Sequence, residues 1–245
     1  MKRILEVCAG SVQSVIAARD GGASRVELCS ALEIGGITPS IGLIAEARKI
    51  EGIALNVLIR PRGGDFLYNE WEIKCMEQDI ATAHQLGADG VVIGALTPQG
   101  DIDIDCCRRL IAKAGDMSIT FHRAFDMCRK PYKALEEIIT LGCHRILTSG
   151  QAATAYAGMS LIKHLEEIAN GRIIIMPGCG VNANNAATIL NETGCIEIHA
   201  SARSVVNSHM QYRHNGVSMG NGENDEYAHM ESDVNIIKQI VEVIK

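Results

Sequence analysis

The sequence predicts an α/β fold, a TIM (β/α)8 barrel that forms a single domain over residues 1–245. Short β-branched runs alternate about eight times with longer amphipathic stretches, which is typical of βα units around a parallel sheet. Glycine stands just after most of the helical stretches, where a left-handed residue ends a helix, and a strand soon follows. A chain of 245 residues with this pattern favours a closed barrel over a doubly wound sheet.

The eight expected strands are short and spread along the whole chain. They lie at residues 4–8, 25–29, 54–60, 90–95, 118–124, 145–149, 172–176 and 197–201. Capping residues mark two helix starts: Asn69 with Glu72 three positions later, and Ser40 before a helix at 41–50. The polar segment 203–233 is expected to be a long βα loop that acts as a lid or lacks order.

Composition and charge argue against several classes of partner. The 29 acidic and 23 basic side chains give a net charge of −6, and no Lys/Arg run is present to neutralise a nucleic-acid backbone. The longest apolar runs have the length of strands, so no membrane partner is expected. No signal-peptide core follows Met1 and the nine cysteines form no CxxC pair, which indicates a cytoplasmic protein with reduced thiols.

Alternation along the strands turns many polar side chains toward the barrel axis. Glu6 and Cys8 are expected to point inward from the first strand, and Glu27 and Cys29 from the second. The same parity turns a further set inward: Asn56, Arg60, Thr120, His122, Glu197, His199 and Ser201. Because an ordinary barrel interior is aliphatic and an unpaired buried carboxylate is costly, these residues are expected to line a polar cavity. The network we expect there consists of Glu6, Glu27, Arg60, His122 and His199.

Two of the inward residues are thiols that suit copper(I). Cys8 and Cys29 are expected at the carboxyl ends of adjacent strands, roughly 5 Å apart if they are in register, with Glu6 and Glu27 one layer below. Copper(I) accepts two soft thiolate ligands. The alternative is that both thiols only fill the barrel mouth. Residues of the long polar segment could add ligands, and we give them little weight: His209, Met210, His214, Met219, His229 and Met230.

A second hypothesis is acid–base catalysis on a small anionic substrate. His122 with Glu6 or Glu27 is suited to move protons, and Asp126 is expected to reach the site from the loop after the fifth strand. Arg60 and Arg62 would hold an anionic group in bidentate fashion. The alternative is a buried ion-pair network that only fills the barrel. Such networks add little stability, which favours a functional role.

A phosphate or carboxylate could also bind beyond the later strands, where barrels often place such sites. The glycines Gly178 and Gly180 expose backbone N–H groups before a helix expected to start at Asn182. The same corner would be closed by residues that follow the sixth and eighth strands: Thr148, Ser149, Gly150, His199, Ser201 and Arg203. A nucleophilic thiol at Cys8 or Cys29 is another alternative, which the neighbouring carboxylates disfavour.

Several motifs in this order resemble the CutC family, named for copper homeostasis. They are LEVCA, RVELCSAL, GGITPS, IRPRGGDF, TFHRAFD, ILTSG, MPGCGV, HASAR and VSMG, and they cover nearly the whole chain. The resemblance implies a TIM barrel, a cytoplasmic location, a homodimer and a role in copper handling through copper(I)-binding thiols. One departure is Cys179 in MPGCGV, where the family usually shows a glycine.

The resemblance assigns residues to two roles without choosing between them. It carries the metal role to Cys8 and Cys29, and the pocket role to a second set: Glu27, Arg60, Arg62, His122, Asp126 and His199. One reading is therefore a copper(I)-binding protein. The other is a TIM-barrel enzyme of unknown activity on a small anionic substrate, phosphorylated or not, and a third is a ligand-binding protein without chemistry. A shared fold does not decide among these functions.

Overall fold

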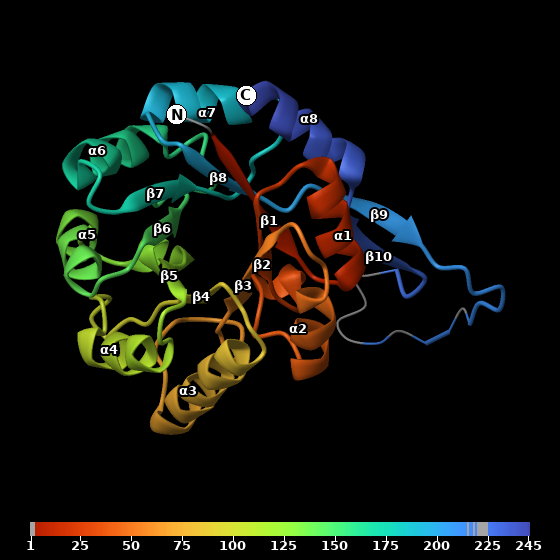
Figure 1. Ribbon diagram of the computed structural model, residues 1–245, viewed down its shortest axis with the longest axis horizontal. Helices are drawn as coiled ribbons and strands as arrows, with labels where there is room; N and C mark the ends of the chain where they lie inside the picture. Colours follow the sequence, from red (N-terminus) through yellow and green to blue (C-terminus); the bar gives the residue numbers. More distant parts are fainter. Residues whose placement is uncertain (1–2, 215, 218, 220–224) are drawn as a thin grey trace.

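The computed structural model describes residues 3–214, 216–217, 219 and 225–245, and Ser218 and Gly220 of the VSMG motif lie outside these ranges. Eight parallel strands form a ring that helices surround (Figure 1). They are β1 (Ile4–Ala9), β2 (Arg25–Leu28), β3 (Ala54–Leu58), β4 (Gly90–Ile93), β5 (Ser118–Phe121), β6 (Arg145–Thr148), β7 (Ile174–Pro177) and β8 (Glu197–Ala200).

The strand order shows that the ring closes as a barrel. Neighbouring strands pair in the order β7-β6-β5-β4-β3-β2-β1-β8, and a parallel bridge between Gly178 and His199 joins the two ends. A side chain at Gly178 would lie 2.5 Å from Leu147 Cδ1 and 3.2 Å from His199 Cβ, so glycine permits this closure. The predicted TIM barrel is confirmed.

Helices follow the strands as the alternating pattern predicts. They are α1 (Val12–Gly21), α2 (Ile41–Arg48), α3 (Glu70–Gln85), α4 (Ile104–Lys113), α5 (Pro131–Thr140), α6 (Met159–Ala169), α7 (Ala186–Thr193) and α8 (Val234–Ile244), with two 3-10 turns, η1 (Leu32–Ile34) and η2 (Arg123–Met127). Asn69 and Glu72 form the expected capping box at the start of α3, and Ser40 caps α2. None of the helices in the described ranges is long and apolar enough to cross a bilayer.

Burial confirms the predicted alternation of the strands. Leu5 and Val7 of β1, with Val26 and Leu28 of β2, belong to the large hydrophobic core between the sheet and the helices. Cys8 and Cys29 instead belong to a small separate cluster inside the barrel, with Leu58 and Val92. Several strands end earlier than expected, since β3 stops at Leu58, β4 at Ile93 and β5 at Phe121. Arg60 and His122 therefore lie just beyond their strands.

The segment after β8 contains regular structure that we did not predict from sequence. Its two ends, β9 (Arg203–Asn207) and β10 (Ala228–Ser232), pair as an antiparallel two-stranded sheet, which lies beside α1 and extends away from the barrel (Figure 1). The backbone N–H of Ser232 donates to Ser14 Oγ of α1 at 3.1 Å, which fixes this sheet to the barrel. The two ends of the expected loop are thus paired strands, whose backbone N–H and C=O groups form hydrogen bonds with each other.

Candidate functional site

A cavity of about 320 Å³ opens at the carboxyl end of the barrel strands. Its lining includes eight of the residues predicted from sequence: Cys8, Glu27, Arg60, His122, Gly180, His199, Ser201 and Arg203. Phe66, Arg123 and Cys179 also line it. Since active sites of such barrels lie at this end, the cavity is the candidate functional site.

Below the cavity, two glutamates and two arginines form what we call the lower layer: Glu6, Arg25, Arg145 and Glu197. Arg25 donates to both Glu6 and Glu197, and Arg145 Nε donates to Glu197 Oε2 at 2.8 Å. All four side chains are largely buried. Although burial opposes it, the two arginines keep the pKa of Glu197 below its usual value. The lower layer therefore consists of mutually paired charges.

Above it lies the upper layer, Glu27, Arg60, His122 and His199, which faces the cavity. His199 Nε2 lies 2.8 Å from Glu27 Oε2, and this contact makes an ion pair when the imidazole is protonated. Burial alone would lower the pKa of His199, but hydrogen bonds with Cys8 and Glu27 raise it well above its usual value. Burial would likewise raise the pKa of Glu27, yet the contact with His199 lowers it. Histidine and glutamate thus stabilise each other's charged form.

Arg60 is a buried cation held by carbonyl groups. Its Nη1 donates to the carbonyl oxygens of Ile34 and Gly36 at 3.1 and 2.9 Å, and its Nη2 donates to Gly64 at 2.7 Å. Its Nε is buried and has no hydrogen-bond partner among the described residues. The Phe66 ring lies under the guanidinium, 4.9 Å from Cζ. Fixed in this way, Arg60 keeps its Nε donor and its charge for a ligand.

His122 presents a second unused donor. Its Nδ1 accepts a hydrogen bond from the Ala124 backbone at 3.1 Å, which places the proton of a neutral ring on Nε2. Nε2 is buried without a partner in the described chain. Burial, opposed by Glu27 and aided by Arg60, lowers the pKa of His122 to about 4. Gly94 makes room for the ring, since a Cβ there would lie 2.6 Å from it. His122 is therefore a neutral hydrogen-bond donor at neutral pH.

The two predicted thiols lie together inside the barrel. Cys8 Sγ and Cys29 Sγ are 3.3 Å apart, although the residue directly opposite Cys8 in β2 is Glu27, so the thiols are not in register as the 5 Å estimate assumed. The hydrogen bond with Cys29, together with burial, raises the pKa of Cys8 well above its usual value. Cys8 lines the cavity, whereas Cys29 is fully buried behind it. A protonated thiol at Cys8 does not support the nucleophile hypothesis.

Asp126 and Ser149 form hydrogen bonds with each other within a turn and do not line the cavity. Asp126 accepts hydrogen bonds from the Thr148 hydroxyl, from the backbone and hydroxyl of Ser149, and from the Gln151 backbone. Its carboxylate also pairs with Arg123 Nε at 2.8 Å. These contacts occupy the acceptor positions of Asp126 and join η2 to the end of β6. The Asp126 carboxylate is therefore not free for the expected proton transfer, and the Ser149 hydroxyl is not free for the expected contact with a ligand.

Arg62 also points away from the cavity. Its guanidinium pairs with Glu72 at 2.6 Å and Asp65 at 3.0 Å on the outer surface, and donates to the Leu67 carbonyl. Of the two arginines expected to hold an anion, only Arg60 lines the cavity. Arg203, which we had placed in the glycine corner, does line it, and its Nε is buried without a partner within the described residues.

The glycine corner forms a turn, but the helix after it, α7, begins at Ala186 and not at Asn182 as expected. Gly180 has φ +72° and lines the cavity, while Gly178 packs against His199 at the barrel seam. Cys179 between them has φ +86°, a left-handed conformation that favours glycine. This explains in conformational terms why glycine suits this position. The Cys179 thiol donates to the Ala153 carbonyl at 3.3 Å.

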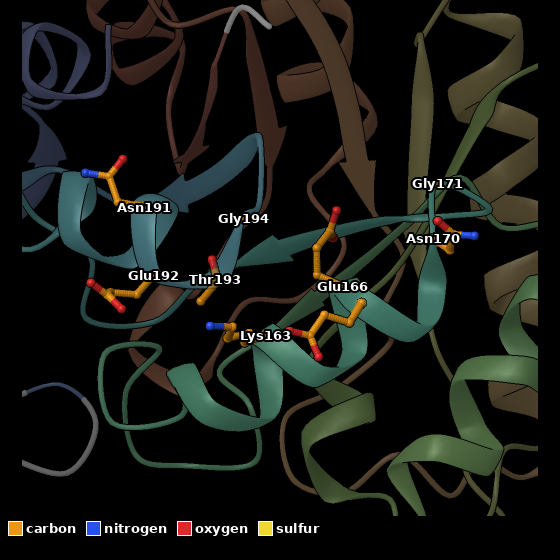
Figure 2. A pocket seen from close by; sticks show the side chains of 9 residues that line it. Lys163, Glu166, Asn170, Gly171, Asn191, Glu192, Thr193 and Gly194 are labelled. Carbon is orange, nitrogen blue, oxygen red and sulfur yellow. The ribbon is translucent and has the colours of Figure 1, made fainter.

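A second cavity, of about 430 Å³, lies outside the barrel between α6 and α7 (Figure 2). Lys163, Glu166 and Glu192 surround it, and none of the residues predicted for the site line it. Gly171 and Gly194 at its edge follow the ends of α6 and α7, which places it toward the amino end of the strands. Because residues at that end of such barrels serve stability, we do not assign this cavity a function.

Two arginines in the barrel were missed. Arg25 and Arg145 are the first residues of β2 and β6, and they share the inward parity of Glu27 and Leu147. The alternation was therefore sufficient to find them. Phe66, which packs under Arg60, comes from a loop and has no periodic signal.

Comparison with known proteins gives a consistent assignment. The profile of the CutC family matches residues 3–204. The chain belongs to the CutC family. It is 51% identical over 244 residues to a CutC family protein of Chromobacterium violaceum, covering 100% of this chain and 99% of the relative. A CutC family protein of Bacteroides thetaiotaomicron is 52% identical over 242 residues, with 98% and 96% covered.

A solved structure agrees with the family assignment. The putative copper homeostasis protein CutC from Streptococcus agalactiae is 38% identical, with a TM-score of 0.78 over 81% of this chain and 98% of that one. The two chains thus share the barrel fold.

Proposed function

We propose that this CutC protein is an enzyme that acts on a small anionic substrate bound in the barrel mouth. One observation carries the proposal: Arg60 and His122 each leave a buried donor without a partner in the described residues, and both side chains line the same cavity. An unsatisfied buried donor costs about 1–3 kcal/mol, which a ligand that supplies an acceptor would recover. A carboxylate or phosphate oxygen is an acceptor that suits donors of this kind.

The cavity volume limits the size of the substrate. About 320 Å³ is at the lower end of the range for small-molecule sites, which suits a metabolite of a few carbon atoms. Arg60 and Arg203 supply positive charge to this cavity, and a substrate with one or two negative groups matches them. The apolar side chains of Phe66 and Leu58 also line this cavity.

The site residues divide into an anion-binding and a proton-transfer part. Arg60 would bind the anionic group, and the neutral ring of His122 would donate from Nε2 to an oxygen on which charge develops. The Glu27 and His199 pair offers a carboxylate base beside a protonated imidazole acid, 2.8 Å apart. This differs from the sequence hypothesis, in which His122 itself moved protons with Glu6 or Glu27. The structure supports a donor role for His122 better, since Nδ1 is occupied by the Ala124 N–H.

The test is a screen of small phosphates and carboxylates by thermal shift, followed by NMR detection of turnover. An anion that binds should raise the melting temperature of the wild type. Arg60→Met should weaken its binding by roughly 30-fold, the equivalent of about 2 kcal/mol for a hydrogen bond to a charged group. Arg62→Met is the matched control and should leave binding unchanged, since Arg62 pairs with Glu72 and Asp65 outside the cavity. Equal binding in the Arg60 and Arg62 variants would reject the assignment.

His122→Asn tests the Nε2 donor while it keeps the second role of this side chain, which is to cap η2. The asparagine side chain can still accept from the Ala124 N–H as an N-cap of η2, while its shorter side chain withdraws the donor from the cavity. We expect a folded protein with reduced turnover. Unchanged turnover in both His122→Asn and Arg60→Met would exclude catalysis by this site.

Copper(I) binding is the second candidate, and the proximity of two soft thiols supports it. Cys8 Sγ and Cys29 Sγ lie 3.3 Å apart, and this soft donor pair fits copper(I). These two residues would hold the ion. The double variant Cys8→Ser/Cys29→Ser should then lose stoichiometric copper(I) uptake, while His122→Ala should keep it. Full uptake by the double variant would remove this candidate. The cytoplasmic location and the homodimer implied by the family resemblance stay predictions.

A further inference from the structure

Three side chains at the base of the cavity bring three different ligand atoms together. The Cys8 thiol, a Glu27 carboxylate oxygen and a His199 ring nitrogen all lie within 4.8 Å of one another. They come from β1, β2 and β8, which are adjacent in the sheet, so the rigid part of the barrel holds them. All three line the cavity, and each is largely buried.

A fourth group beside them lacks a partner. Glu6 is 1% exposed, and its Oε1 has no hydrogen-bond partner in the described part of the chain. This oxygen lies 3.9 Å from His199 Nε2. Arg25 binds only the other oxygen, Oε2. A buried acceptor without a partner, next to one of the three ligand atoms, gives a cation at this place a further negative group.

The charges of the layers give the same indication. The two arginines of the lower layer pair with Glu6 and Glu197. Neither of these arginines pairs with Glu27, whose one ion-pair partner among the described residues is His199. A divalent cation bound by one carboxylate, one thiolate and a neutral imidazole gives a site with no net charge, which lowers the cost of burying it.

We propose that Cys8, Glu27 and His199 bind one divalent metal ion of borderline softness, such as zinc, in a site with an open position toward the cavity. Mixed sulfur, nitrogen and oxygen donors suit such an ion, and three protein ligands with an open position are typical of catalytic metal sites. This inference rests on the proposed function and deepens it: the open position faces the cavity that Arg60 and His122 line, so a bound anion and the metal would meet there. With the metal bound, Glu27 and His199 are its ligands in place of the base and acid of the metal-free site, and His122 keeps its role as a donor. The ion would polarise an oxygen of the substrate.

This site differs from the copper(I) pair in its ligands. Cys29 does not line the cavity and does not belong to the triad. Glu27 and His199 take no part in a two-thiol site. Variants at Cys29 and His199 therefore distinguish the two metals.

The experiment uses cobalt(II) as a spectroscopic probe of the full-length protein after treatment with a chelator and a thiol reductant. We expect one equivalent of cobalt per chain, with the absorption of a sulfur-to-cobalt charge-transfer band, and displacement by zinc. Cys8→Ser should abolish the band. His199→Gln should weaken affinity at least about 100-fold, beyond what the loss of an outer-sphere contact costs. Cys29→Ser is the matched control and should keep both the band and the affinity.

Three results would overturn the inference: no stoichiometric cobalt in the wild type, a band that survives in Cys8→Ser, or equal loss in Cys29→Ser and His199→Gln. A cooperative thermal unfolding transition, measured without cobalt on the same variants, shows that each is folded. The Arg60→Met variant separates this inference from the proposed function. It should bind cobalt as the wild type does while it loses the anion. Anion binding without cobalt binding would reject the metal site alone, and cobalt binding without an anion would reject the proposed function alone.

Discussion

The two charged layers inside the barrel differ in how their charges are compensated. In the lower layer each carboxylate meets an arginine, and Arg25 alone bridges Glu6 and Glu197. In the upper layer only Glu27 and His199 pair, while Arg60 and His122 keep buried donors that no described residue accepts. The layers are adjacent and built on the same strands. The difference teaches that the lower layer stabilises the barrel and that the upper layer is prepared for a ligand.

Breaking the lower layer should have the largest effect on stability. Arg25→Met removes the cation between Glu6 and Glu197 and leaves buried carboxylates without full compensation. We expect the free energy of unfolding to fall by about 3–5 kcal/mol, measured by urea titration. Arg19→Met, at an exposed pair with Asp20, is the control and should cost under about 1 kcal/mol. Similar losses in the two variants would show that the lower layer is not a structural unit.

His122 of the upper layer should make the free energy of unfolding depend on pH. The folded state keeps the pKa of His122 near 4, below the value of about 6.5 for an unfolded histidine, so the unfolded chain binds the extra proton first. Stability should therefore rise with pH between about 4 and 6.5, by up to about 3 kcal/mol from this residue. Glu27 and Arg60 face the ring and act in opposite directions.

The His122→Asn variant isolates this contribution. Because asparagine does not titrate and can still cap η2, its acid limb should be flatter than that of the wild type while stability at pH 7 changes little. Urea titrations at several pH values would measure this difference. Identical acid limbs for the two proteins would contradict a buried neutral His122.

The smallest effect is expected outside both layers. Arg62 has ion pairs of its own, but it is partly exposed and contacts Glu72 and Asp65 on the surface. Arg62→Met should lower the free energy of unfolding by under about 1 kcal/mol, as usual for surface ion pairs. Thermal and chemical denaturation together would measure it. A loss as large as that of Arg25→Met would mean that the IRPRGGDF loop contributes to the structural core.

The alternating pattern of the sequence was sufficient to predict the barrel and to predict which acids and thiols point into it. The alternation of Glu6 and Cys8 with Leu5 and Val7 is a property of any strand with one face on a hydrophobic layer, so it transfers directly to the structure. The same rule would have found Arg25, had strand edges been included. The alternation does not predict how far neighbouring strands are offset from each other. Cys8 lies opposite Glu27, and not opposite Cys29, because the strands of a barrel are offset.

Loop residues could not be placed from the sequence for a different reason. The directions of Arg62 and Asp126 depend on hydrogen bonds with Glu72, 10 residues away, and with the turn at Thr148, 22 residues away, and these contacts follow no period. The pairing of β9 with β10 likewise joins segments about 20 residues apart across a polar stretch. Local patterns therefore identified the scaffold, while tertiary contacts decided which loop groups reach the cavity.

The ring of His122 offers the most direct test of the central claim. In protein with 15N-labelled histidine at pH 7, NMR should show a neutral imidazole protonated at Nε2. Its N–H resonance should shift when the anion that most stabilises the fold is added, and it should not shift in Arg60→Met. A charged imidazole, or an Nε2–H signal that no binding anion perturbs, would contradict a barrel mouth prepared for an anionic ligand.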